Sequence, residues 1–239
     1  MIPKIIHQTW KDENIPEKWI DSVNSCKRVY SDFTYMLWTD EKMEEFIKNE
    51  HSWFYDTYMG YPHHIQRCDA FRYFVLYTYG GIYLDMDITC LKDLKDFLKY
   101  DTVLVKSMHI STVYTNSFFM SSKSNPFFKF CIEQLEKYKD SYDMFGKHLH
   151  VMNSTGPIFL THIVKKYGPI DNVHLLSNQE FAGNCSVCNV NKGCKGGEYF
   201  SHVEGSSWIS WDTRLYTYVF CNYKPLLILF ILIFIYFVI

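Results

Sequence analysis

The chain lacks an excess of either charge: 24 Lys and Arg stand against 26 Asp and Glu, a formal net charge of −2 over 239 residues. Without a basic surplus to neutralise phosphates, the composition gives no support for a nucleic-acid partner. Glycine (11) and proline (7) are too scarce for a collagenous or low-complexity chain, and only Ala70 and Ala182 are alanines. Hydrophobic residues nevertheless make up 48% of the chain. That content excludes disorder and suits one large folded domain.

Charge is missing altogether from the C-terminal stretch Pro225 to Ile239. As a helix this stretch would span about 22 Å, less than the roughly 30 Å of a bilayer's hydrocarbon core. The length alone favours a buried terminal helix, but the stretch is apolar on every side, unlike a helix that docks on a core. We therefore predict a folded domain over residues 1–218 and a hydrophobic, membrane-attached segment over residues 219–239.

The cellular compartment stays open at this level. Residues 1–7 contain no apolar region of the kind found in signal peptides. With a C-terminal anchor, the simplest topology would leave the folded part on the cytosolic side, although the sidedness is not determined. Five cysteines are scattered without a disulfide-like spacing: Cys26, Cys68, Cys90, Cys131 and Cys221.

A cluster of three cysteines, Cys185, Cys188 and Cys194, lies in a segment rich in glycine and asparagine. Three thiols at this spacing are compatible with a zinc site that takes His202 or Cys221 as its fourth ligand. They are equally compatible with one disulfide, or with neither role.

Short apolar segments alternate with amphipathic ones along the chain. Strands are expected at residues 2–7, 33–38, 82–84, 102–106, 113–120 and 198–203. Helices are expected after Pro16 and Asp40 and at residues 64–79, 126–138 and 157–167. This alternation predicts an α/β fold with a mostly parallel sheet that helices cover on both faces.

The chemistry-bearing residues gather in one stretch. Asp69 and Arg72 are three apart in a predicted helix, so they share a face. Asp85 and Asp87 follow the predicted strand Ile82–Leu84 and, two apart on extended chain, point the same way. The carboxyl end of a strand is where open α/β sheets bind ligands. Two convergent carboxylates favour Mg²⁺ or Mn²⁺, whereas the same residues could also form a solvated turn and a helix ion pair.

The chain resembles the family 32 glycosyltransferases, and within them the fungal mannosyltransferases that act on inositol-phosphorylceramide. The resemblance runs from Ile2 to about Asp212. It rests on the ordered segments 2–10 (IPKIIHQTW), 15–19 (IPEKW), 37–40 (LWTD), 69–87, 154–157 (STGP) and 205–208 (GSSW). It implies a GT-A-type fold, a nucleotide-sugar donor, a divalent metal ion and retention of anomeric configuration.

The resemblance also implies roles for single residues. Residues His7 to Trp10 would line the nucleotide base and ribose, and Asp69 and Arg72 would hold the donor sugar and diphosphate. Asp85 would contact ribose or sugar, and Asp87 would be the main metal ligand. Ser207 and Trp208 belong to a loop that would close over the diphosphate, with His202 as a further metal ligand beside it.

Several of these assignments have structural alternatives. Trp10 could be a core aromatic residue, and His202 could simply be hydrogen-bonded within its strand. Thr155 either caps a helix or belongs to the acceptor side. The adjacent His63 and His64 are expected to point apart, as a surface pair.

As an activity, the resemblance implies transfer of mannose from GDP-mannose, with Mn²⁺ or Mg²⁺, to a lipid or glycan acceptor at a membrane of Golgi or ER type. UDP-galactose or UDP-glucose remains an alternative donor. Two other functions stay open: a metal-dependent phosphohydrolase that uses the two aspartates, and a membrane-attached binding protein with reduced catalysis. No residue stands out as a nucleophile.

Overall fold

The computed structural model describes residues 1–107, 112–185, 188, 194–203, 205 and 208–238, with side chains as far as Lys224. A six-stranded sheet has the order β2-β1-β3-β6-β5-β7, and β4 pairs with β8 in a second sheet. The strands are β1 (Ile5–Thr9), β2 (Thr34–Trp38), β3 (Gly81–Leu84), β4 (Ile88–Cys90), β5 (Thr102–Val105), β6 (Phe118–Ser121), β7 (Val173–Leu176) and β8 (Phe200–His202). The pairs β1–β2, β1–β3 and β5–β7 are parallel, whereas β6 runs antiparallel to β3 and β5. The large sheet is therefore mixed and mostly parallel, which confirms the predicted fold class.

The helices are α1 (Glu17–Val29), α2 (Asp40–Glu50), α3 (Tyr55–Met59), α4 (His64–Tyr79), α5 (Pro126–Tyr138), α6 (Lys147–Ser154), α7 (Pro157–Tyr167), α8 (Asn178–Phe181) and α9 (Trp211–Val238). Short 3₁₀ turns occupy Ser52–Phe54, Lys95–Phe97 and Asp143–Phe145. Helices α4, α5 and α7 have the predicted bounds because local residues fix their ends. Gly80 follows α4 with a φ of 67°, and Pro126 and Pro157 occupy first helical positions.

Other elements differ from their predicted bounds. Strand β1 begins at Ile5 rather than Ile2, because the N–H of Ile2 donates to Leu98 O at 2.8 Å, away from the sheet. Helix α2 is capped by Thr39, whose hydroxyl accepts the Lys42 N–H at 3.3 Å, and Asp40 is its first residue rather than its cap. The predicted strand at 113–120 shrinks to β6. Strands β4 and β7 and helix α6 have no counterpart in the prediction.

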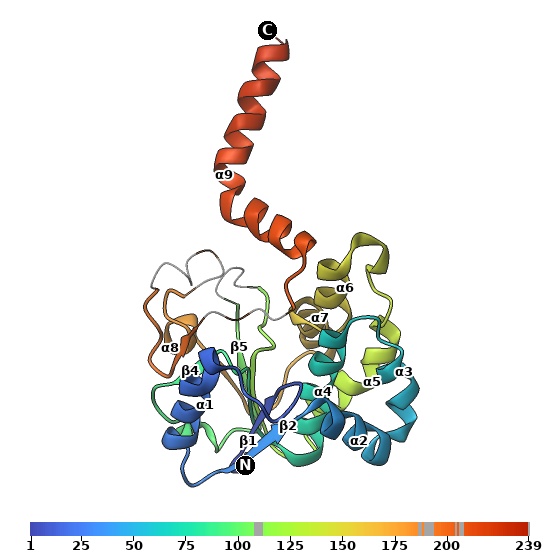
Figure 1. The fold of residues 1–239 in the computed structure, drawn as a ribbon, viewed down its shortest axis with the longest axis vertical. Helices are drawn as coiled ribbons and strands as arrows, with labels where there is room; N and C mark the ends of the chain where they lie inside the picture. The colour runs from blue at the N-terminus through green and yellow to red at the C-terminus, as the bar shows by residue number, and fades with distance from the viewer. Residues whose placement is uncertain (108–111, 186–187, 189–193, 204, 206–207, 239) are drawn as a thin grey trace.

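Side-chain alternation along the strands divides the core into two layers. Figure 1 shows α4, α5 and α7 on one side of the large sheet and α1 and α8 on the other. Tyr83 and Phe119 point into one layer, which α4, α5 and α7 complete. Ile82 and Phe118 point into the other layer, which α1, α8 and β8 complete. The central strands are consequently buried on both faces, and the ends of β1 and β3 are the places where polar groups can reach an opening.

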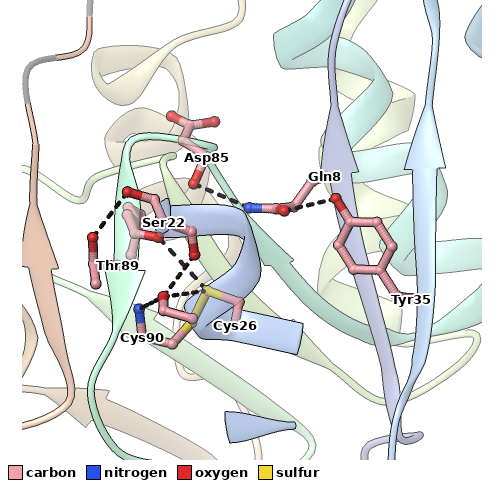
Figure 2. Close-up of a disulfide and its surroundings, with 9 residues drawn as sticks. Gln8, Ser22, Cys26, Tyr35, Asp85, Thr89 and Cys90 are labelled. Carbon is pink, nitrogen blue, oxygen red and sulfur yellow. Dashed lines mark hydrogen bonds between the residues drawn. A yellow bond between two sulfur atoms is a disulfide. The ribbon is translucent and has the colours of Figure 1, made fainter. Parts of the chain in front are cut away.

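Six of the eight cysteines form disulfides, a pairing that their scatter in the sequence did not predict. Cys26–Cys90 joins α1 to β4, and Figure 2 shows it beside the hydrogen bond between Ser22 and Thr89. The other two are Cys185–Cys194 and Cys188–Cys221, the second of which reaches α9.

These disulfides decide between the alternatives that the sequence left open for the cysteine cluster, which is disulfide-bonded and is not a zinc site. They also correct one expectation, because Cys26, Cys90 and Cys221 are paired although their scatter indicated no disulfide.

Helix α9 begins on the domain and then runs away from it (Figure 1). Asp212 fastens its start: one carboxylate oxygen accepts the N–H of His148 at 2.8 Å, and the other accepts the N–H of Thr213 at 2.8 Å. Position 219, the predicted start of the hydrophobic segment, lies within this helix. Side chains beyond Lys224 fall outside the described residues. Within the residues that the structure describes, no helix combines the length and the apolar character needed to cross a bilayer.

Candidate functional site

A cavity of about 730 Å³ opens at the carboxyl ends of β1 and β3 and is lined further by α4 and α6. Its wall includes Trp10, Asp69, Arg72, Asp85, Asp87 and Trp208. The structure thus brings six of the predicted site residues to one cavity, although they come from segments far apart in the sequence. The position agrees with the expected ligand-binding edge of an α/β sheet.

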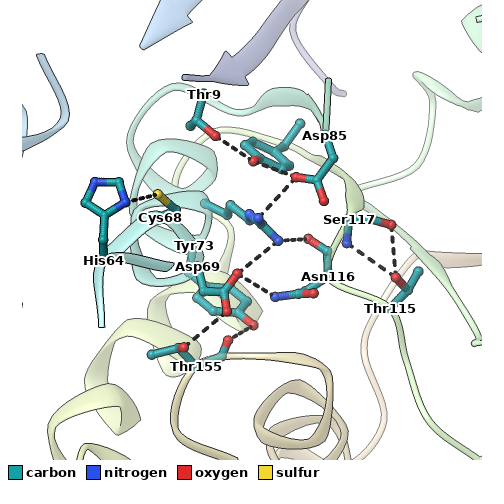
Figure 3. A network of polar contacts seen from close by, with 12 residues as sticks. Thr9, His64, Cys68, Asp69, Tyr73, Asp85, Thr115, Asn116, Ser117 and Thr155 are labelled. Carbon is teal, nitrogen blue, oxygen red and sulfur yellow. Dashed lines mark hydrogen bonds and ion pairs between the residues drawn. The ribbon is translucent and has the colours of Figure 1, made fainter. Parts of the chain in front are cut away.

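Arg72 is the centre of the polar network in this cavity (Figure 3). Its Nη1 lies 3.0 Å from Asp69 Oδ1 and donates to the carbonyl of Asn116 at 2.8 Å. Its Nη2 lies 3.1 Å from Asp85 Oδ1. The guanidinium carbon also lies 5.0 Å from the centre of the Tyr83 ring. One buried cation is therefore shared between a helix carboxylate and a strand-end carboxylate.

Asp69 is held by two further partners. Its Oδ1 accepts from the side-chain amide of Asn116 at 3.0 Å, and its Oδ2 accepts from the Thr155 hydroxyl at 3.2 Å. Both Asp69 and Arg72 are almost fully buried. A buried carboxylate with these partners is fixed in position, which suits a residue that aligns a ligand.

Asp85 is the more open member of the network, with 27% of its side chain exposed. The Tyr83 hydroxyl donates to Asp85 Oδ1 at 2.9 Å and lies 3.0 Å from the hydroxyl of Thr9. The strand ends of β1 and β3 are thus joined by a chain of hydroxyls that leads to the carboxylate.

Burial raises the pKa values of the carboxyl groups in the cavity. The pKa of Asp69 rises from 3.8 to about 6 because of burial, and Arg72 opposes the rise. The pKa of Asp85 also reaches about 6, through burial and despite Arg72. Burial raises the pKa of Asp87 as well. Perturbed carboxyl groups that face a cavity are typical of ligand or cation sites.

Asp85 and Asp87 converge through a turn rather than along an extended strand. The N–H of Ile88 donates to Asp85 O at 3.2 Å, which closes the turn, and Met86 is buried within it. A methyl group at position 205 would overlap Asp87 Oδ2, so only glycine fits beside this carboxylate. Asp87 therefore lies directly against Gly205, in the segment that follows β8.

The residues at this turn fit a hard divalent cation in their donor chemistry, since carboxylate oxygens are the ligands that Mg²⁺ and Mn²⁺ prefer. His202 offers an imidazole nitrogen as a possible further ligand. It lies on β8, where it pairs with Ile88, the residue that follows Asp87. Burial lowers the pKa of His202 to about 4, and its Nε2 has no hydrogen-bond partner among the described residues.

The imidazole of His202 does not form one ligand group with the carboxylates of Asp85 and Asp87, however. Its ring packs 5.2 Å from that of Phe181, on the inner side of β8. In the described part of the chain, the one group of three possible ligand residues with atoms within 4.8 Å of one another is Asp40, His64 and Cys68. His202 therefore stays a predicted ligand that the structure leaves apart from Asp85 and Asp87.

His7 is a correction to the predicted site. It is fully buried, its Nε2 lies 2.9 Å from Gly80 O, and its Nδ1 accepts from the indole of Trp38 at 3.1 Å. Burial lowers its pKa to about 4. Because His7 lies two residues before the end of β1, its ring belongs to the core rather than to the cavity wall, and it cannot contact a nucleotide there.

Trp10, by contrast, lines the cavity. Its ring stands edge-on to Trp19 with the centroids 4.9 Å apart, and its indole N–H donates to Asn14 O at 3.1 Å. This aromatic pair gives the cavity an apolar wall, against which a base could pack.

The segment after β8 reaches the cavity from the opposite side. Trp208 lines the cavity, its carbonyl accepts from Lys147 Nζ at 2.8 Å, and its ring stacks on His148 at 5.8 Å. Ser207, the other predicted residue of this loop, lies outside the described residues.

Sequence reasoning missed Asn116, Tyr83 and Lys147, and it left the role of Thr155 open. Asn116 had no local signal, because only the fold brings it to Asp69. Tyr83 was visible as part of the strand before Asp85, and its alternation with Asp85 could have indicated a shared face. Thr155 is now seen to bind Asp69 directly.

The sequence comparisons agree with this site. A family described as "Glycosyltransferase sugar-binding region containing DXD motif" matches residues 16–108, which include Asp69 and the Asp85–Asp87 turn. The inositol phosphoceramide mannosyltransferase 1 of Schizosaccharomyces pombe is 38% identical over 95% of this chain and 68% of its own length. The mannosyl phosphorylinositol ceramide synthase CSH1 of Saccharomyces cerevisiae is 36% identical over 90% of this chain and 54% of its own length.

An uncharacterized glycosyltransferase, L373 of Acanthamoeba polyphaga mimivirus, is 30% identical over 87% of this chain and 84% of its own length. Among solved structures, the PaToxG glycosyltransferase has a TM-score of 0.49 at 18% identity and covers 70% of each chain. At that score the likeness carries no weight, and the fold rests on the sheet described above. Together with the cavity, the relatives show that this chain is an enzyme of the family 32 glycosyltransferases, those with a DXD-containing sugar-binding region, and is homologous to mannosyltransferases.

Proposed function

We propose that this chain transfers mannose from GDP-mannose to a glycolipid acceptor such as inositol phosphoceramide, with a divalent cation and with retention of configuration. The observation that carries the proposal is the Asp69–Arg72–Asp85 network at the carboxyl end of β3. This network faces a cavity large enough for a nucleotide sugar. Mannose and the acceptor are taken from the names of the relatives, of which this chain spans 68% and 54%. GDP as the carrier of the sugar is what the family resemblance implies.

Asp87 and Asp85 would hold the cation, with His202 as a further ligand if β8 shifts toward them. The cation would supply positive charge against the negative charge that develops on the leaving diphosphate. The glycine at position 205 leaves room for the Asp87 carboxylate to face the cavity, since any side chain there would displace it.

Arg72 and Asp69 would act chiefly through position. Arg72 neutralises the carboxylates of Asp69 and Asp85, so both can stay ionised next to an anionic donor. Asn116 and Thr155 hold Asp69 where a sugar hydroxyl could donate to it. The wall formed by Trp10 and Trp19 would receive the base of the nucleotide.

We further propose that the domain works in an oxidising lumen, at a membrane of Golgi or ER type. The three disulfides support the oxidising compartment. The membrane attachment rests on the apolar stretch of residues 225–239 in the sequence and stays a prediction.

The proposal is tested by a donor screen that measures release of nucleoside diphosphate in the presence of Mn²⁺, with and without vesicles that contain inositol phosphoceramide. We expect release from GDP-mannose that depends on both the metal and the lipid. Preferential release from UDP-galactose or UDP-glucose would instead assign the alternative donor.

The variant Asp87→Ala should abolish turnover and metal-dependent donor binding, because it removes the central carboxylate of the turn, while the near-ultraviolet circular dichroism stays that of the wild type. Full activity of Asp87→Ala would refute the metal role. Donor binding without turnover by the wild type would point to a binding protein, and acceptor-independent release of inorganic phosphate would point to a phosphohydrolase.

A further inference from the structure

Three side chains at one wall of the cavity have no part in the proposed transfer: Asp40, His64 and Cys68. Asp40 is the first residue of α2, and His64 and Cys68 lie one turn apart on α4. His64 Nε2 is 3.0 Å from Asp40 Oδ1, and Cys68 Sγ is 3.6 Å from His64 Nδ1. Figure 3 shows the imidazole and the thiol facing each other, so His64 is exposed as expected but is partnered by Cys68 and Asp40.

The three groups are arranged as metal ligands. One ligand atom from each, a carboxylate oxygen, an imidazole nitrogen and a sulfur, lie within 4.8 Å of one another. Asp40 Oδ1 is buried, and the partner that it meets at 3.0 Å is His64 Nε2, which is itself a member of the group. Imidazole, thiolate and carboxylate together are a donor set that suits Zn²⁺ rather than Mg²⁺ or Mn²⁺.

The charge of these three groups and their access to the cavity also fit a divalent cation. A thiolate and a carboxylate carry two negative charges between them, so a divalent cation would make the partly buried group neutral. All three residues line the cavity, so a cation held by them keeps a coordination position open toward the space. Sites with three protein ligands and one open position are typical of zinc that can bind a further ligand.

We propose that Asp40, His64 and Cys68 form a second cation site, specific for Zn²⁺ or a similarly soft divalent ion and separate from the Asp85–Asp87 turn. The site does not depend on the proposed transferase activity, because its ligands are not residues of that mechanism. A cation bound there sits in the same cavity, next to Asp69, and covers the thiol of Cys68.

A second interpretation of the same residues is a relay in which His64, held by Asp40, removes the proton of a nucleophilic Cys68. The surroundings of the thiol disfavour it: burial raises the pKa of Cys68 to about 12, opposite to the shift that activates a cysteine. A bound metal ion would offset the effect of burial on the thiol, because it binds the thiolate directly.

Co²⁺ is a suitable probe, because a cobalt–thiolate bond gives a charge-transfer absorption in the near ultraviolet. The full-length chain, with its disulfides intact and without reductant, should bind one equivalent of Co²⁺ with that band, and Zn²⁺ should displace it. Cys68→Ser should lose the band. His64→Ala, at an exposed position, should weaken binding by more than about a hundredfold, the upper end of the loss expected even for an outer-shell partner.

Two controls make the result specific. Asp87→Ala should keep the band, because it alters only the other carboxylate pair, and Cys131→Ser should keep it, because that free cysteine is buried in the core. A folded wild type without the band, or a Cys68→Ser variant that retains it, overturns the proposal. Rapid alkylation of Cys68 by iodoacetamide that Zn²⁺ does not slow would also overturn it and favour the relay.

Discussion

The two layers of the domain are held together by different means. The layer formed by α4, α5 and α7 contains the two free cysteines, Cys68 and Cys131, and depends on aromatic and aliphatic packing. The layer that contains α1, α8, β4 and β8 is joined by covalent links, of which Cys26–Cys90 lies within its core. The cavity lies where the two meet: Asp69 and Arg72 come from the packed layer, and Asp87 borders the cross-linked one. The comparison teaches that packing and polar contacts hold Asp69 and Arg72, whereas the Asp85–Asp87 turn leads into β4, which a disulfide ties to α1.

The largest expected effect is that of Arg72→Met in the packed layer. It leaves the buried carboxylates of Asp69 and Asp85 without their cation, which should lower the free energy of unfolding by about 3–5 kcal/mol. Urea denaturation measures the loss, and turnover should vanish with it. Arg28→Met, on the exposed side of α1, is the matched control and should change stability by less than about 0.5 kcal/mol. Equal stability of the two variants would show that Arg72 does not hold the packed layer together.

The cross-linked layer is tested by Cys26→Ser combined with Cys90→Ser. Removal of this link should cost about 2–4 kcal/mol, because the unfolded chain regains the freedom of a 64-residue loop. Hydrogen exchange should rise first in β4 and β8 and remain slow in α5. Cys68→Ser, which removes a free thiol, serves as the control. Uniform acceleration across both layers would mean that they unfold as one unit.

A smaller effect is expected at the junction itself, from Gly205→Ala. The added methyl group displaces the Asp87 carboxylate, so kcat/KM for the donor should fall at least about tenfold, or about 1.4 kcal/mol, with little change in stability. Gly60→Ala adds a methyl group that meets the flexible end of Lys139, and it should behave as the wild type. An unchanged kcat/KM in Gly205→Ala would show that the segment after β8 does not take part in the site.

The last expected effect concerns pH. The pKa of Asp69 is about 6 in the folded protein against 3.8 ordinarily, so the folded state binds the proton more tightly. The stability that this contributes is full below pH 3.8 and is lost as the pH rises through 6. Relative to the wild type, Asp69→Asn should therefore gain stability between pH 4 and pH 7. A difference that is constant with pH, measured by thermal unfolding, would contradict the raised pKa.

The sequence was informative wherever a local signal fixes the structure. Helices α4, α5 and α7 were predicted to the residue because glycine and proline mark several of their ends. The place of Asp85 and Asp87 after a buried strand was also predicted, although an extended backbone was expected where the structure has a turn. Long-range pairing was not predictable: no spacing indicates that Cys188 meets Cys221, and nothing near Asn116 points to Asp69. The expectation for His7 was wrong for a related reason. Whether a strand residue is buried or lines a cavity depends on how far the neighbouring elements extend beyond it.

The fastening of α9 has a mechanical consequence. Asp212 ties the first turn of α9 to the first turn of α6, and Lys147 in that same turn holds the carbonyl of Trp208. Farther along α6, Val151 and Met152 belong to the cavity wall. A force applied along the C-terminal helix would thus be shared by two attachments, the Cys188–Cys221 disulfide and the contacts of Asp212 with α6. Through the second attachment, tension on the far end of the helix would reach the rim of the cavity.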